Sequence, residues 1–150
     1  MRENLFRGKT YKTSVFDKTD WVYGSLIDSG NHEQVDIYPW HNGASTMSVR
    51  QLVYARMEAV KPETVGQFTG IPDKNGKLIY EGDIVKSNDR CFVAVVRWRA
   101  DRAAFDLEIY YKGIPDDSLL FIPSIVSGLE VIGNIHDNPD LLQDERTWLW

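Results

Sequence analysis

Two neighbouring segments whose side chains alternate in polarity, residues 91–99 and 105–111, constrain the fold of this chain more than any other feature. Successive side chains of a β-strand point to opposite faces of a sheet, so this alternation predicts two strands. One set of alternate positions is apolar: Phe92, Ala94, Val96, Trp98, then Phe105, Leu107, Ile109 and Tyr111. Because only residues 100–103 separate the segments, they predict an antiparallel hairpin with one core face, to which Trp98 belongs.

Turn signals around this hairpin predict that most of the chain is β structure. Asn75 and Gly76, in the run Asp-Lys-Asn-Gly at residues 73–76, predict a tight type I′ hairpin turn because both tolerate positive φ angles. Further strands are predicted at residues 21–27, 34–38 and 129–135. An aromatic share of 12% also favours strands.

Short strands joined by tight turns between about residues 79 and 135 predict a small antiparallel barrel of about five strands. Residues 1–60 are expected to form an irregular N-terminal β lobe. Residues 61–150 are expected to hold the barrel, a short C-terminal helix and the tail. One integrated domain of residues 1–150 is the alternative, since a chain of this length can build a single core.

Three segments have weaker local signals. Residues 48–60 fit helical and strand spacing equally well, and a strand is favoured in the second half of the segment. Residues 62–70 predict a short helical turn, with Pro at the first position and Gly at the end. Asn138 and Pro139 predict the start of the C-terminal helix, with Asn138 as its cap and residues 140–145 as its body.

The net charge of −5 and a pI of about 5.1 describe an acidic protein that its overall field does not draw to nucleic acid or to anionic membranes. No apolar run approaches the roughly 20 residues that a membrane helix needs. The single cysteine, Cys91, cannot form an internal disulfide. These features predict a cytoplasmic protein without a membrane partner.

Several motifs spread over the whole chain resemble those of the YopX-like family of phages and prophages. They are found at residues 6–9, 21–24, 63–70, 73–77, 79–85 and 131–139, and the central ones read ETVGQFTG, DKNGK and IYEGDIV. The resemblance implies a mainly β fold with an SH3-like barrel at about residues 79–135, self-association, and a bacterial host cell. The family has no established activity, so it assigns no catalytic residue.

Metal and cofactor sites are not predicted. His32, His41 and His136 do not have metal-ligand spacing with one another or with the cysteine. The run at residues 73–76 has its Gly in the fourth position, whereas a calcium loop needs Gly in the sixth. Phosphate-binding and dinucleotide fingerprints are missing from the sequence.

Catalytic residues are not predicted either, and the chain is expected not to be an enzyme. Asp73, Glu81 and Asp83 flank one predicted hairpin and would support a hydrolase only if they shared a pocket. Acidic residues in turns more often accept hydrogen bonds from their own backbone. Cys91 opens an apolar strand, where a buried cysteine acts as a small hydrophobic residue.

Two groups of residues are candidates for contact with other macromolecules. Arg97, Arg99 and Arg102 surround the central hairpin beside Trp98 and are the candidate nucleic-acid contacts, because small barrels use basic grooves and aromatic side chains for this purpose. Trp148 and Trp150 are the candidate oligomer contacts. Packing of these two side chains against their own domain is an equally weighted alternative.

The hypothesis favoured by these observations is a non-enzymatic accessory protein that assembles with itself and binds another macromolecule, such as a host or phage protein. The alternative is a nucleic-acid-binding module of phage DNA or RNA metabolism.

Overall fold

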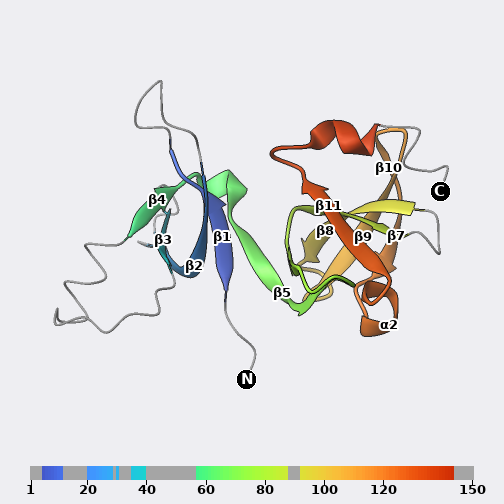
Figure 1. Cartoon of the computed structure of the whole chain (residues 1–150), viewed down its shortest axis with the longest axis horizontal. Coiled ribbons are helices and arrows are strands. Elements are labelled where there is room, and N and C mark those ends of the chain that lie inside the picture. The colour runs from blue at the N-terminus through green and yellow to red at the C-terminus, as the bar shows by residue number, and fades with distance from the viewer. Residues whose placement is uncertain are drawn as a thin grey trace. The chain divides into compact units, whose positions relative to one another are not determined.

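The computed structural model describes residues 5–11, 20–28, 30, 35–39, 57–87 and 92–143 of the chain. It divides into two compact units, Met1–Gln67 and Phe68–Trp150. Eleven strands, one short α-helix and two short 3₁₀ helices lie in the described residues (Figure 1). The predicted mainly β fold is confirmed.

Unit 1 is an antiparallel sheet of strands in the order β4-β3-β2-β1, followed by the first residues of β5. Its elements are β1 (Phe6–Lys9), β2 (Trp21–Asp28), β3 (Val35–Pro39), β4 (Glu58–Val60), η1 (Pro62–Thr64) and the start of β5 (Gly66–Pro72). Three side chains, Val35, Ile37 and Val60, form its buried core.

Unit 2 is built on a five-stranded antiparallel sheet in the order β10-β9-β8-β7-β11. Its elements after β5 are β6 (Leu78–Tyr80), β7 (Asp83–Ser87), β8 (Phe92–Arg99), β9 (Ala104–Tyr111), β10 (Ile114–Leu120), α2 (Pro123–Val126), β11 (Leu129–Asn134) and η2 (Pro139–Leu142). The predicted central hairpin is therefore β8–β9. Within the described residues no pairing joins the edge strands β10 and β11, so the sheet does not close into a barrel.

Both faces of the β8–β9 hairpin are buried, which corrects the expectation of one core face. Phe92, Ala94 and Val96 pack into the larger core together with side chains of β9, α2 and β11. Val93 and Val95, on the opposite face, form a second core that the partly buried Ile132, Ile135, Leu141 and Leu142 cover. Side chains of β11 and of the segment that follows it thus bury the second face of the hairpin at Val93 and Val95.

Trp98 is not a core residue, contrary to the prediction. It lies on the predicted face and contacts Phe105 edge-on, with ring centroids 5.1 Å apart. However, its side chain remains 41% exposed because it stands near the end of β8, beyond the last fully buried residue, Val96.

The predicted turn at residues 73–76 is present, but it is not of type I′. Gly76 has φ +84° and its N–H donates to the carbonyl of Asp73 at 3.0 Å, whereas Asn75 does not have the positive φ that a type I′ turn requires. Two consecutive positive φ angles occur instead at Lys112 (+50°) and Gly113 (+79°), between β9 and β10. That turn was not predicted because Lys-Gly is a weaker signal than Asn-Gly.

Two other local predictions need correction. The helical turn expected over residues 62–70 ends at Thr64, because Gly66 already belongs to β5 and pairs with β1. Pro139 begins η2 as predicted, but the Asn138 side chain does not cap it; its Oδ1 accepts a hydrogen bond from the N–H of Asn134 at 3.3 Å.

The strand favoured in the second half of residues 48–60 is present at the end of that segment as β4, whereas residues 48–56 lie outside the described residues. Among the helices that the structure describes, none combines the length and the apolar composition needed to span a membrane.

Candidate functional site

Asp73 is a buried structural residue. Its Oδ1 accepts hydrogen bonds from the N–H groups of Asn75 (2.8 Å) and Lys77 (2.9 Å), and its Oδ2 accepts one from Val131 (3.0 Å). Burial raises the pKa of the carboxyl, but these three hydrogen bonds and the charge of Lys77 outweigh it, so the pKa lies below its ordinary value of 3.8. The carboxylate therefore stays charged and holds the hairpin turn against β11.

The other acidic turn residues also bind backbone. Asp83 is almost fully buried, and its Oδ2 accepts a hydrogen bond from the N–H of Tyr80 at 2.8 Å. Glu81 Oε1 accepts a longer one from the N–H of Trp98 at 3.4 Å. In the part of the chain that the structure describes, no group of three His, Cys, Asp or Glu residues is arranged to hold a metal ion.

Cys91, His32 and His41 lie outside the described residues, as do Trp148 and Trp150. The roles predicted for the two tryptophans stay predictions.

The three candidate arginines lie at one end of the β8–β9 hairpin, and each has an acidic partner. Arg97 Nε contacts Glu108 Oε2 at 3.1 Å, and the Tyr110 hydroxyl donates to the same oxygen at 2.8 Å. Burial alone lowers the pKa of Arg97, but the hydrogen bonds and charges of Tyr110 and Glu108 raise it above its ordinary value. The Arg97 guanidinium is therefore charged and is fixed on the sheet by Glu108 and Tyr110.

The remaining two arginines pair with neighbours in sequence. Arg99 Nε contacts Asp101 Oδ1 at 3.1 Å, and Arg102 Nη1 contacts Asp106 Oδ2 at 2.9 Å. Asp106 is 1% exposed, and its second oxygen has no hydrogen-bond partner. Because each candidate arginine has a carboxylate partner, the surface that they form is close to neutral.

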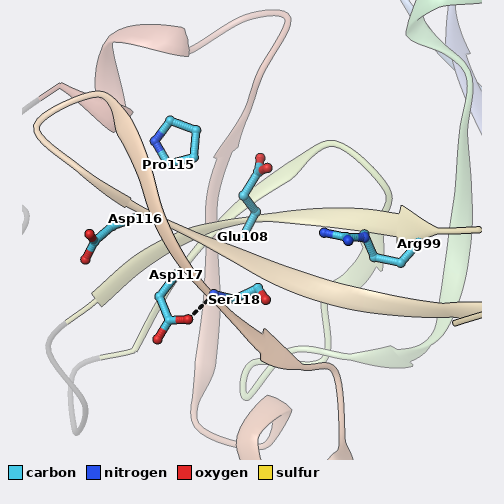
Figure 2. Close-up of a pocket in the computed structure, with 6 residues that line it drawn as sticks. All are labelled: Arg99, Glu108, Pro115, Asp116, Asp117 and Ser118. Carbon is cyan, nitrogen blue, oxygen red and sulfur yellow. Dashed lines mark hydrogen bonds between the residues drawn. The ribbon is translucent and has the colours of Figure 1, made fainter. Parts of the chain in front are cut away.

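A depression with a volume of about 300 Å³ lies beside one of these arginines, Arg99 (Figure 2). Its lining residues come from β8, β9 and β10, and they are Arg99, Glu108, Pro115, Asp116, Asp117 and Ser118. The lining residues carry three carboxylates and one guanidinium, so the depression is acidic. The sequence interpretation missed this site, since only the pairing of Ser118 with Glu108 brings the Asp-Asp pair of β10 onto the hairpin.

The sheet edge at β11 is covered by its own chain. The outward carbonyl of Leu129 accepts a hydrogen bond from the N–H of Lys74 at 3.0 Å, and the N–H of Val131 donates to Asp73. An ion pair between Lys74 and Glu130, 2.7 Å long, lies beside these bonds.

The edge at β10 is only partly blocked. Phe121 donates to the carbonyl of Phe105, so Leu119 and Asp117 bond toward β9, whereas Ser118 and Leu120 direct their backbone groups outward. Asp117 Oδ1 accepts the Ser118 N–H at 2.7 Å, and the Leu120 carbonyl accepts the Ile122 N–H at 3.0 Å. Among the described residues, the Ser118 carbonyl and the Leu120 N–H have no partner.

The family model described as YopX protein matches residues 10–143, which include β2 to η2 and all residues of the site. No curated protein matches the chain. Because the family model covers most of the sequence, the chain belongs to the YopX family.

Proposed function

We propose that this YopX family member is a non-enzymatic accessory protein, encoded by a phage or prophage, that assembles with itself and binds another macromolecule in the bacterial cytoplasm. The observation that carries this proposal is the exposure of large apolar side chains on the hairpins of unit 2. Trp98, Tyr111, Ile114 and Leu120 are 41% to 68% exposed. Exposed apolar groups of this kind are typical of surfaces that contact other proteins.

The environment of the acidic turn residues supports the proposal that the protein is not an enzyme. Asp73 and Asp83 are buried and bound to backbone N–H groups, which fits a structural role better than proton transfer. The strand order of unit 2 is compatible with an SH3-like barrel, and we include that architecture in the proposal.

Light scattering at micromolar concentration tests self-assembly. We expect a mass that is a multiple of the 17.2 kDa of one chain. A species with the mass of a single chain would contradict self-assembly. Deletion of residues 147–150 then tests the role of Trp148 and Trp150. An oligomer whose subunit number is unchanged by the deletion would show that these two residues do not contribute to the interface.

Nucleic-acid binding is the second candidate function, and the exposure of Trp98 near Arg99 and Arg102 favours it. Affinity capture from induced host cells, with both protein and nucleic acid identified, separates the candidates. Recovery of a specific protein supports the first proposal. Recovery of nucleic acid that is lost in an Arg99→Ala/Arg102→Ala variant supports the second.

A further inference from the structure

We infer that the edge of β10 at Ser118 and Leu120 binds an extended segment of another protein that carries lysine or arginine side chains. The inference rests on the proposed function, because it names the class of macromolecule that the protein binds and the place where it binds.

The backbone supplies the first part of the argument. The Ser118 carbonyl and the Leu120 N–H point away from β9 and are two positions apart, which is the spacing that an added strand uses for a pair of hydrogen bonds. Longer pairing is prevented, since Pro115 has no N–H, a register shift follows it, and the Asp117 side chain occupies the Ser118 N–H. The open edge therefore accepts a short segment in one register.

The side chains supply the second part. Alternate side chains of an added strand would lie on the same face of the sheet as Ser118, next to the depression lined by Asp116, Asp117 and Glu108. Glu108 is already paired with Arg97, and Arg99 with Asp101. No cation of the described residues pairs with Asp116 or Asp117, so the complementary group on the segment is a cation.

A second copy of the chain is a poor occupant of this edge. In a symmetric contact between two β10 strands through Ser118 and Leu120, residues 114–122 of the second copy would lie along this edge, and that segment contains no lysine or arginine to pair with Asp116 and Asp117. Self-assembly would therefore use other surfaces, and this edge would remain available to a different protein.

Titration of the full-length protein with a short extended peptide of alternating valine and lysine tests the inference. The control peptide has glutamate in place of lysine. We expect the lysine peptide to bind and to shift the amide resonance of Leu120, and the glutamate peptide not to bind. Failure of the lysine peptide to bind at millimolar concentration, or equal binding of both peptides, would overturn the inference.

Charge reversal supplies the matched variants. Asp116 is exposed and accepts no hydrogen bond within the described residues, so Asp116→Lys should preserve the fold, which a thermal unfolding midpoint checks. We expect Asp116→Lys to lower the affinity for the lysine peptide at least tenfold. Glu58→Lys, an equal charge change at an exposed position of β4 in unit 1, should leave this affinity unchanged. Equal affinities of both variants would overturn the inference.

The capture experiment distinguishes this inference from the proposed function. If the wild-type protein and Asp116→Lys capture the same protein partner equally well, the edge assignment is wrong and the proposed function stands. If the wild-type protein captures no specific macromolecule, the proposed function itself fails.

Discussion

The two edge strands of the unit 2 sheet, β11 and β10, are protected in different ways. At β11 the turn at Asp73 and Lys74 binds the outward backbone groups of Leu129 and Val131, so the chain itself supplies the missing neighbour. At β10 protection is local, through Pro115 and the Asp117 side chain, and one donor and one acceptor have no partner among the residues that the structure describes. The comparison teaches that the groups which cover β11 contribute to the stability of the fold, whereas the β10 edge is the one that we propose for binding.

Replacement of Asp73 should have the largest effect. Asp73→Ala removes the acceptor of three backbone N–H groups, one of them the buried N–H of Val131, and we expect a loss of about 3–5 kcal/mol in the free energy of unfolding. Urea unfolding measures it. The control is Asp116→Ala at the open edge, which should change stability by no more than about 0.5 kcal/mol. Equal losses of unfolding free energy in both variants would show that the two edges do not differ in their contribution to stability.

Replacement of Gly76 examines the turn that places Asp73. Gly76 has φ +84°, which a β-branched residue adopts only with strain, so Gly76→Val should cost about 1–2 kcal/mol or more. A Cβ at this position would meet open space, so the cost arises from the backbone and not from a clash. Gly76→Asn should recover part of the loss, since Asn tolerates this conformation. An unfolding midpoint unchanged by valine would show that the turn does not depend on this angle.

The sequence predicts the strands well and the edges poorly. Alternation places β8 and β9, and the Asn-Gly signal places the turn before β6, because both depend on neighbouring residues. The hydrogen bond from the Val131 N–H to Asp73 joins residues that are 58 positions apart, so no local sequence pattern predicts it. The second core and the acidic depression were missed for the same reason, as each depends on which strand lies beside which.

Acid should weaken the covered edge specifically. The folded-state pKa of Asp73 is lowered, so its contribution is complete above the ordinary value of 3.8 and is lost as the pH falls through the folded-state pKa below it. In urea unfolding from about pH 5 to about pH 2.5, we expect the stability difference between wild type and Asp73→Asn to shrink. A constant wild-type to Asp73→Asn difference would contradict a charged Asp73.

The smallest effect is expected at the turn that leads into the open edge. Lys112 has φ +50°, and Asn is favoured over Lys at the first position of a type I′ turn. Lys112→Asn should therefore raise the free energy of unfolding by about 0.5 kcal/mol without changing the affinity for the lysine peptide. Loss of peptide binding in this variant would mean that the hairpin tip, and not the edge at Ser118 and Leu120, makes the contact.

The long sequence separation between Asp73 and Val131 has a consequence for the order of folding. The bonds from Asp73 to Asn75 and Lys77 are local and can form with the hairpin within microseconds. We expect the hydrogen bond from the Val131 N–H to form later, after the intervening chain is ordered, because closing a long loop costs entropy before any contact compensates for it. We therefore expect β11 to be an uncovered edge strand during that interval, and the folding chain to be more prone to aggregation then than in the native state.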